Sequence, residues 1–461
     1  MNAPMHSAIA LDLGTTSIKA GLLGREGELR NIIALPAPKI AVNGGRYESD
    51  AISYAKTVEQ VLNDSIDCAS DCKTLGMCSQ RSSFLLWEQT TGQPVTPLIS
   101  WQDTRGAASF EALRGNEKNI RNLAGLPLTP YYFTPKLRVV LLDNPEWRIR
   151  LEQGELLVGT LDTFLIWRWT GGKKYVTDAS MAARTLLMDI SHLQWSPPLC
   201  DLFGIPLHIL PEIKPSAGMN IKLDNGLVLQ ASVGDQSAAL FASVSEGQPE
   251  ALVNLGTGCF VVRYLPEGKT ASNGYLQTLV YQDGARKVHF AIEGTLNSIT
   301  AALAPYPVDE CVVDDLGRDE VFCIAEPSGL GAPYFRGDIG IRFSKPVEHF
   351  SKTRIAALML EAVIFRAARM LEEIHRVYAI DRVYLSGGLS ELICLQNGIA
   401  RCVPFDVYRL GQSESSLHGA ALLAAGMECR RDGTKVRVTG DAMLLQEKFR
   451  RWKVWLDGLL A

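Results

Sequence analysis

Runs of apolar residues along the chain predict strands and helices in mixed order. Near the start, the apolar runs 9–13 and 18–23 flank a Gly-Thr turn and predict a β-hairpin. Apolar residues spaced three and four apart predict a helix over 51–69, and apolar positions on nearly all sides predict a long buried helix over 353–378. Because strands and helices alternate on both sides of the polar stretch 243–250, the pattern predicts an α/β protein with two domains.

The Gly-Thr turn has a counterpart half a chain later. The first copy is Asp12-Leu-Gly-Thr-Thr and the second is Asn254-Leu-Gly-Thr-Gly, each between two apolar runs. Glycine allows the backbone to approach a ligand closely, and the turn's amides and hydroxyls can then face an anion. The pair predicts two similar lobes that close on one nucleotide. Asp12 either caps its own turn or holds Mg²⁺, and the duplication favours the second role.

Asp235 is a second candidate for chemistry, because an apolar strand ends at the preceding glycine and a helix follows. An aspartate there either caps the helix or acts as a general base that accepts the proton of an attacking hydroxyl. Arg81 is either a surface cation or a fork for hydroxyls and phosphate. Trp101 and Tyr131 add aromatic surface of the kind that lines polyol sites, although such residues are more often core.

Size, charge and cysteine usage narrow the class of protein. The chain has 461 residues, which is more than a single hydrophobic core usually organises. Its composition of 47% hydrophobic and 21% charged residues is typical of globular proteins. A net charge of −4 argues against nucleic-acid binding. No apolar run reaches the roughly 18 residues of a membrane span, and no signal peptide pattern occurs. The 10 cysteines lack zinc spacing. We therefore expect a cytoplasmic protein with no nucleic-acid or membrane partner.

Ordered motifs over nearly the whole chain resemble those of the FGGY carbohydrate kinases, with the glycerol kinases as the closest pattern. Each short motif is weak alone, but their order is specific. In chain order they include Leu-Asp12-Leu-Gly-Thr-Thr-Ser, Ser-Gln80-Arg81-Ser-Ser, Ile-Ser-Trp101-Gln102, Pro130-Tyr131, Gly234-Asp235-Gln236-Ser, Leu255-Gly-Thr-Gly-Cys-Phe260, Gly329-Leu-Gly-Ala-Pro-Tyr334 and Leu385-Ser-Gly-Gly388.

This resemblance implies two actin-like, ribonuclease-H-type lobes, 1–245 and 246–461, with the active site in the cleft between them. It implies a kinase that uses ATP and Mg²⁺, with Asp235 as the catalytic base and Asp12 as the metal-linked carboxylate. The residues expected on the nucleotide side are Gly14, Thr15, Thr16, Lys19, Gly256, Thr257, Gly331, Gly387 and Gly388. The residues matched to substrate positions are Arg81, Ser82, Trp101, Tyr131, Asp235, Gln236 and Phe260. Relatives often form dimers or tetramers, so a homodimer fits the resemblance.

Ser82 is the clearest departure from the glycerol kinase pattern, which has a glutamate at that position. Losing this charge-assisted acceptor would cost about 1.5–3 kcal/mol of glycerol binding. We therefore expect a small ketose or a polyol other than glycerol as substrate, with glycerol kinase proper as the alternative. Two other classes are a non-enzymatic protein like actin or a chaperone ATPase lobe, and a silent sugar sensor. Both are disfavoured, the first by the polyol-type residues and the second because Asp12 and Asp235 are both present.

Overall fold

The computed structural model describes residues 6–272, 274–411, 414–428 and 433–461. The chain divides into two compact units. The first comprises 6–242 together with the later segments 278–289 and 414–428, and the second contains the remaining described residues. Two segments of the predicted second lobe are thus grouped with the first unit.

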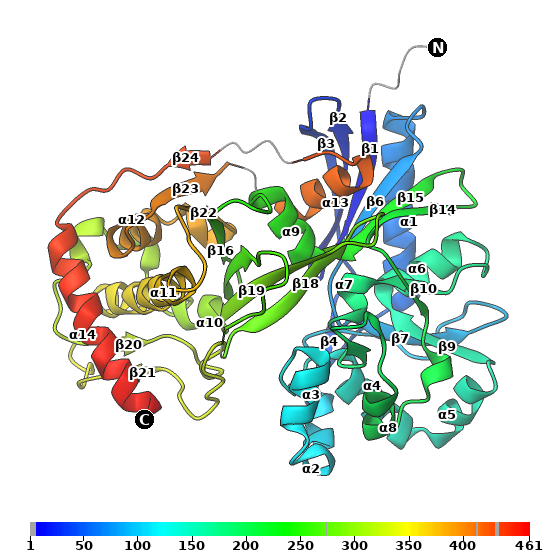
Figure 1. Cartoon of the computed structure of the whole chain (residues 1–461), viewed down its shortest axis with the longest axis horizontal. Helices are drawn as coiled ribbons and strands as arrows, with labels where there is room; N and C mark the ends of the chain where they lie inside the picture. The colour runs from blue at the N-terminus through cyan, green and yellow to red at the C-terminus, as the bar shows by residue number, and fades with distance from the viewer. Residues whose placement is uncertain (1–5, 273, 412–413, 429–432) are drawn as a thin grey trace. The chain divides into compact units, whose positions relative to one another are not determined.

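The first unit is built on a six-stranded sheet with the order β14-β15-β6-β1-β2-β3. The predicted hairpin of β1 and β2 is antiparallel, while β6 and β15 run parallel to β1. Helices α1 and α13 pack against this sheet, and Figure 1 shows α13 beside β1 and β6. The strands are apolar because helices bury them. Their bounds are β1 (His6–Leu13), β2 (Ser17–Gly24), β3 (Leu29–Pro36), β6 (Thr74–Ser79), β14 (Ala217–Lys222), β15 (Val228–Gly234), α1 (Ala51–Cys68) and α13 (Ser415–Ala425).

The first unit also contains a five-stranded sheet, in the order β4-β5-β8-β7-β9. Helix α6 begins directly after β9 of this sheet, whereas α9 begins directly after β15 of the six-stranded sheet. These and other elements of the unit are β4 (Ala41–Asn43), β5 (Arg46–Ser49), β7 (Phe84–Glu88), β8 (Leu98–Ile99), β9 (Leu156–Thr160), α4 (Phe133–Asp143), α6 (Leu161–Trp169), α7 (Ala179–Ala182) and α9 (Asp235–Ser243).

The second unit repeats the strand arrangement of the first. Its hairpin of β16 and β17 is antiparallel, β22 runs parallel to β16, and β23 runs parallel to β22. The sheet continues from β17 to β19 on one side and from β23 to β24 on the other. This repeat confirms the predicted pair of similar α/β lobes. The strands are β16 (Glu250–Leu255), β17 (Cys259–Tyr264), β19 (Val288–Leu296), β22 (Arg382–Ser386), β23 (Asp406–Leu410) and β24 (Gly433–Lys435).

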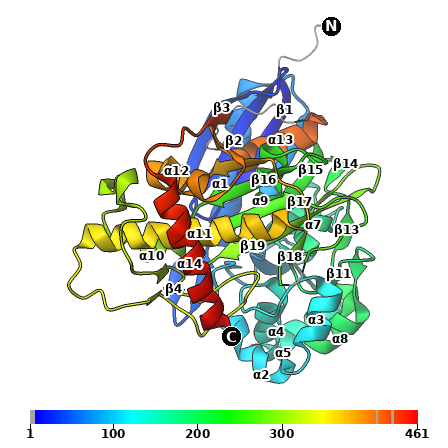
Figure 2. The ribbon, with the colours of Figure 1, turned by 60° about the vertical axis from the view of Figure 1, so that its left-hand side comes forward.

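The core of the second unit surrounds α11 (Lys352–His375), which confirms the predicted long buried helix. Ser351 caps its start by accepting a hydrogen bond from the amide of Arg354. The terminal helix α14 (Ala442–Leu460) crosses α11 in Figure 2, and the ring of Phe365 packs on that of Phe449 at 5.3 Å between centroids. Among the described residues, no helix is both long and apolar enough to span a membrane.

Candidate active site

Three neighbouring parallel strands of the first unit end at the same edge of the sheet. Asp12 of β1 is in register with Cys78 of β6, and the next residue of β6, Ser79, is in register with Gly234 of β15. The register therefore brings Asp12, the Gln80-Arg81 loop and the start of α9 to one carboxyl edge. Open α/β sheets bind their ligands at such an edge.

Asp235 lies at this edge as the first residue of α9. The sequence pattern had suggested that it caps the helix from the position just before it. Its Oδ1 accepts a hydrogen bond from the amide of Gln236 at 2.8 Å and lies 3.7 Å from Nε of Arg81. Burial raises the pKa of Asp235, and the Arg81 guanidinium opposes that rise. The carboxylate nevertheless keeps 33% of its side-chain surface exposed. Asp235 is therefore accessible to an incoming hydroxyl and has a cation beside it.

Arg81 is held in place on three sides. Its guanidinium donates to Oε1 of Gln236 in addition to its contact with Asp235. A Cβ on Gly234 would lie 2.8 Å from Cδ of Arg81, so only glycine leaves room for the arginine to cross the turn. The arginine is thus a partly buried cation of the site, and its fork faces residues that were predicted to bind substrate.

Asp12 is the second carboxylate of this edge. Its Oδ1 accepts from Sγ of Cys78 at 3.4 Å, and burial, followed by the charge of Asp235, raises the pKa of Asp12 to about 7. Among the described residues, no group of three potential metal-ligating side chains occurs. Magnesium is usually held by one or two carboxylates together with water and phosphate oxygens. A carboxylate that is costly to ionise without a cation fits that kind of ion.

Thr15 of the first Gly-Thr turn and Lys19 of the following strand β2 already have partners within the unit. The hydroxyl of Thr15 donates to Oε1 of Gln80 at 3.0 Å and accepts from the indole nitrogen of Trp101 at 3.0 Å. Nζ of Lys19 lies 2.6 Å from Oε2 of Glu414. A phosphate bound at this turn would have to share or replace these contacts.

Gly14 and Thr16 complete the predicted phosphate-binding set of the first unit. The carbonyl of Gly14 accepts a hydrogen bond from the hydroxyl of Tyr54 at 2.7 Å, which fixes the turn to helix α1. Thr16 is exposed at the tip. The turn is therefore anchored at its base and open at Thr16, and its contact with phosphate stays a prediction.

The predicted acceptor residues of the first unit differ in exposure. Trp101 and Tyr131 are 37% and 43% exposed, so both present aromatic surface to solvent. Ser82 is buried, has a φ of +63°, and its hydroxyl donates to the carbonyl of Arg184 at 3.2 Å. Its hydroxyl proton is thus already in use, and only its lone pairs remain for a ligand.

Sequence reasoning missed Arg184, which lies near the same edge. Its positive charge opposes the rise in the pKa of Asp235, its guanidinium carbon lies 5.5 Å from the ring centroid of Tyr132, and its Nη1 donates to Thr278 at 3.5 Å. Arg184 is buried. The available signal was a single charged residue in the stretch 181–188, where Thr185 is the only other polar residue.

The second Gly-Thr turn belongs to the second unit. The amide of Gly256 donates to the carbonyl of Gly258 at 2.9 Å, and the hydroxyl of Thr300 donates to the carbonyl of Gly256 at 2.9 Å. Thr257 is exposed, whereas Thr15, its counterpart in the first turn, is half-buried. Phe260 lies on β17 and is half-buried. The predicted roles of these residues at phosphate and substrate remain predictions.

Gly387 and Gly388 follow β22 at the carboxyl edge of the second sheet. Gly387 has a φ of +87°, and a Cβ there would lie 2.5 Å from the carbonyl oxygen of Leu255. Glycine is therefore required for the turn to pass the end of β16. A Cβ on Gly388 would meet no atom within 4 Å. The chain packing explains Gly387, and proximity to adenosine stays a prediction for both residues.

A buried ion pair shapes the segment that contains Gly331. Oε2 of Glu326 accepts from the amide of Gly331 at 3.0 Å, and its Oε1 accepts from Nε of Arg366 at 2.7 Å. Arg366 also reaches the carbonyls of Thr295 and Ala332, at 3.4 Å each. The backbone of the Gly-Leu-Gly-Ala-Pro motif is thus held by two buried charged side chains, a structural role that the sequence alone did not reveal.

Glu326→Gln should lower the free energy of unfolding by about 3–5 kcal/mol, because it removes one partner of a fully buried ion pair. Urea denaturation followed by circular dichroism measures this loss. Asp338→Asn removes an exposed partner of Arg336 and should leave the urea midpoint unchanged. Equal midpoints for the wild type and Glu326→Gln would show that the buried pair does not stabilise the unit.

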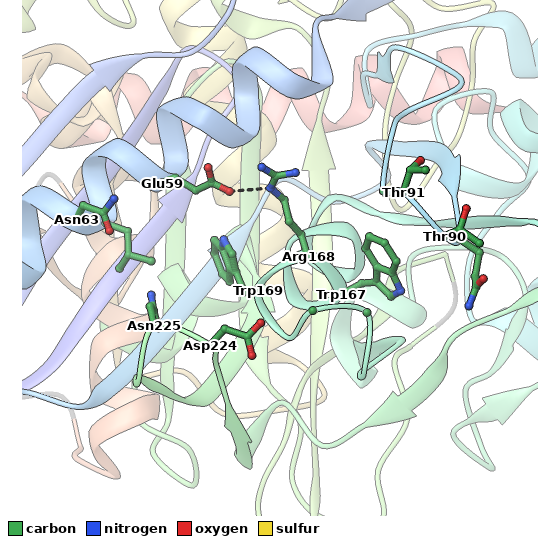
Figure 3. A pocket seen from close by; sticks show the side chains of 14 residues that line it. Glu59, Asn63, Thr90, Thr91, Trp167, Arg168, Trp169, Asp224 and Asn225 are labelled. Atoms are coloured by element: carbon green, nitrogen blue, oxygen red, sulfur yellow. Dashed lines mark hydrogen bonds and ion pairs between the residues drawn. The ribbon is translucent and has the colours of Figure 1, made fainter.

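A separate pocket of about 850 Å³ lies in the first unit between α1, the turn after β7 and the end of α6. Figure 3 shows Glu59 and Arg168 on its wall, where Nε of Arg168 donates to the glutamate at 2.7 Å. Trp167 and Trp169 form another part of the lining. None of its lining residues is a predicted site residue.

The two sheets, each an antiparallel hairpin continued by parallel strands, define a two-domain α/β protein of the actin-like ATPase fold. Residues 7–234 match the N-terminal domain of the FGGY family of carbohydrate kinases, and 251–427 match the C-terminal domain of that family. The chain belongs to this family. It is therefore an ATP-binding kinase that transfers phosphate to an alcohol group.

Individual relatives agree with this assignment. Glycerol kinase 1 of Streptomyces avermitilis is 30% identical over 98% of this chain and 96% of its own length. The crystal structure of Plasmodium falciparum glycerol kinase with ADP has a TM-score of 0.84 at 22% identity, covering 98% of each chain. Xylulose kinase from Rhodospirillum rubrum has a TM-score of 0.81 at 18% identity, again over 98% of each chain. The two solved structures support the fold.

Proposed function

We propose that this kinase transfers the γ-phosphate of ATP to a terminal hydroxyl of a small ketose or of a polyol other than glycerol. The arrangement of Asp235 beside Arg81 and Gln236 supports this proposal most strongly. Asp235 accepts the proton of the attacking hydroxyl, while Arg81 and Gln236 hold neighbouring hydroxyls. Phosphoryl transfer needs little else from a protein than positioning, charge neutralisation and such a base.

On this proposal, Asp12 holds Mg²⁺ through water at the end of β1. When bound, the ion neutralises charge on the phosphate oxygens. The two Gly-Thr turns supply amides and hydroxyls to the phosphates of ATP, from Gly14, Thr15 and Thr16 in one unit and Gly256 and Thr257 in the other. Lys19 lies on β2, which follows the first turn, and it leaves Glu414 to reach a phosphate.

Ser82 supports an acceptor other than glycerol. Glycerol kinases resemble this chain but have a glutamate there, which accepts hydrogen bonds from substrate hydroxyls. In this chain the position is buried, and the serine hydroxyl donates to the backbone carbonyl of Arg184. Glycerol therefore lacks the charged acceptor that a glutamate would supply at position 82, whereas Trp101 and Tyr131 keep exposed surface for a longer carbon chain.

A coupled assay of ADP release tests the proposed acceptor class. Glycerol, erythritol, erythrulose, xylulose and ribulose are compared at equal concentrations with ATP and Mg²⁺. We expect a ketose or a longer polyol to give a kcat/KM about tenfold or more above that of glycerol. A glycerol preference would instead support the alternative, glycerol kinase proper, which the Streptomyces relative favours by its name.

Ser82→Glu should lower the KM for glycerol by about tenfold or more, because it supplies a charged acceptor worth roughly 1.5–3 kcal/mol. KM is measured by ADP release with glycerol as the varied substrate. Ser83→Ala, which changes the neighbouring buried serine without adding charge, serves as the control and should not improve glycerol use. An unchanged KM in a folded Ser82→Glu variant would contradict the role assigned to this position.

A cytoplasmic location and a homodimer stay predictions from the sequence.

A further inference from the structure

Lys136 is a fully buried lysine in the first turn of α4, with no exposed surface. Its Nζ donates to the backbone carbonyl of Ser82 at 2.8 Å and to that of Ser100 at 2.8 Å. It also lies 5.6 Å from the ring centroid of Phe84. One side chain thus joins two loops that are far apart in the sequence.

Each of these loops carries a residue of the proposed acceptor site. Ser82 follows Arg81, and Ser100 precedes Trp101. A second link runs in parallel, because the amide of Trp101 donates to the hydroxyl of Ser83 at 2.9 Å. The separation between Arg81 and Trp101 is therefore fixed by contacts that do not involve either side chain directly.

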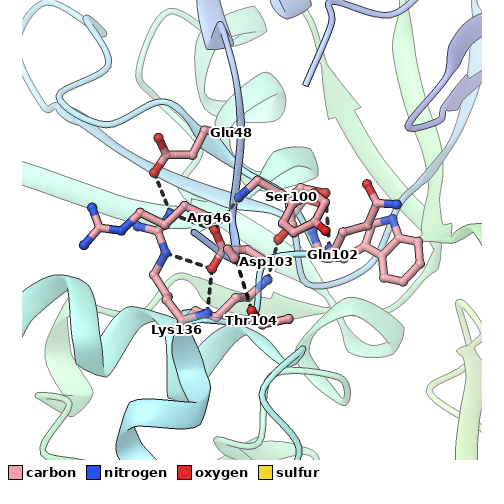
Figure 4. A network of polar contacts seen from close by, with 12 residues as sticks. Arg46, Glu48, Ser100, Gln102, Asp103, Thr104 and Lys136 are labelled. Carbon is pink, nitrogen blue, oxygen red and sulfur yellow. Dashed lines mark hydrogen bonds and ion pairs between the residues drawn. The ribbon is translucent and has the colours of Figure 1, made fainter. Parts of the chain in front are cut away.

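The neighbouring charges do not explain the buried lysine as an ion pair. Figure 4 shows Asp103 and Lys136 in one network of polar contacts. Both carboxylate oxygens of Asp103, however, are engaged by Arg105, at 2.8 Å and 2.7 Å, and Oδ2 also accepts from the amide of Tyr47 at 2.8 Å. The direct partners of Lys136 are neutral carbonyls.

This placement is unfavourable for a cation on two counts. Burial removes the charge from water, and the first turn of a helix repels positive charge. Burial accordingly lowers the pKa of Lys136 to about 7, against an opposing effect of Asp103. A neutral amine still has two N–H groups, so both carbonyl contacts persist in either protonation state. An apolar side chain would fill the same space without this cost but could not bind the carbonyls.

We propose that Lys136 is a positioning residue of the acceptor site, where it fixes the separation between the Arg81-Ser82 loop and the Trp101 loop and thereby selects the size of the acceptor. This inference rests on the proposed function, because it assigns the two loops to acceptor binding. Lys136 does not touch substrate; it acts through the two carbonyls.

Lys136→Met keeps the length and apolar stem of the side chain and removes its donors. Two measurements follow the variant. Hydrogen–deuterium exchange reports the amides of Trp101 and Asp103, which donate to Ser83 and to the carbonyl of Ser100. Steady-state kinetics report KM for ATP and for the best acceptor of the screen, with glycerol as a fixed comparison. We expect exchange at both amides to accelerate about tenfold or more, the KM of the best acceptor to rise by a similar factor, and the KM for ATP to stay within about twofold.

Lys448→Met is the matched control, because Lys448 is also fully buried and pairs with Glu361 in the second unit. It should lower stability but leave acceptor KM and the two exchange rates unchanged. If Lys136→Met does not fold, Lys136→Gln, which retains a donor on a shorter chain, is measured in the same way and should show a smaller change in the same direction. Wild-type values of acceptor KM and of both exchange rates in either folded Lys136 variant would overturn the inference. A wild type without acceptor-dependent ADP release would refute the proposed function instead. The exchange experiment would still test whether Lys136 holds the two loops together through the carbonyls of Ser82 and Ser100.

Discussion

Asp235→Asn should lower kcat by about 10²–10⁴-fold, because an amide cannot accept the proton of the attacking hydroxyl. The change leaves the size of the side chain almost unaltered, and asparagine can still accept the hydrogen bond from the amide of Gln236. Acceptor binding should therefore change much less than turnover. ADP release at saturating ATP and acceptor measures the effect.

The pH dependence of the wild type provides a second readout of the same residue. Asp235 acts as a base only when ionised, so kcat/KM falls as the pH decreases through its pKa. Burial raises that pKa above the usual aspartate value, which places the acidic limb at a higher pH than for an exposed carboxylate. Residual activity of Asp235→Asn should lack this limb.

Asp441→Asn is the matched control for the substitution at Asp235. Asp441 also lies at the start of a helix, where it caps α14 by accepting from the amide of Met443. The same chemical change there should leave kcat unaltered. A kcat for Asp235→Asn within about threefold of the wild type would show that another group accepts the proton.

Asp12→Asn should lower kcat by about a hundredfold and raise the Mg²⁺ concentration required for half-maximal activity. The reason is the loss of the carboxylate that the proposal assigns to the hydrated ion at the end of β1. Titration of activity with MgCl₂ at fixed ATP measures both effects.

Cys78→Ser is the appropriate control for Asp12, since it changes the neighbour that donates to the carboxylate but keeps the charge. Its Mg²⁺ dependence should match that of the wild type. If Asp12→Asn retained both kcat and the Mg²⁺ midpoint, the metal assignment would be wrong, although the role of Asp235 would stand.

The sequence predicted the parts of the fold that local patterns encode. Apolar runs beside the Gly-Thr turns predicted both hairpins, and the apolar spacing after Ser351 predicted α11. These features depend on residues that are close in the chain. The strand and helix order then predicted an α/β protein, and the resemblance supplied the family that the comparisons show.

Contacts between distant segments were not predictable in this way. One such contact joins Lys19 to Glu414, 395 residues further along the chain, while the role of Lys19 at phosphate stays a prediction. Helix α13 packs on the sheet of the first unit although the sequence placed it in the second lobe. No local pattern indicates which sheet such a helix covers.

The same reason explains the residues that sequence analysis missed at the candidate site. Lys136 looks locally like an ordinary cation at the start of a helix, and its role follows only from two carbonyls contributed by other loops. The role of Arg184 likewise follows from a contact that the sequence does not show, because its positive charge acts on the pKa of Asp235. The roles predicted for residues of the second unit, among them Gly256 and Thr257, stay predictions, because these roles are contacts with a nucleotide.

The fate of the γ-phosphate tests the proposed chemistry most directly. ³¹P nuclear magnetic resonance of a reaction with ATP, MgCl₂ and the best acceptor of the screen distinguishes a phosphate ester from free phosphate. We predict that the wild type forms a phosphate monoester in step with ADP, and that Asp235→Asn forms almost none in the same time. Two results would contradict this account. If the wild type released the same amount of free phosphate whether or not any acceptor was present, phosphate would not be transferred to an alcohol. If Asp235→Asn formed the monoester as fast as the wild type, Asp235 would not be the base.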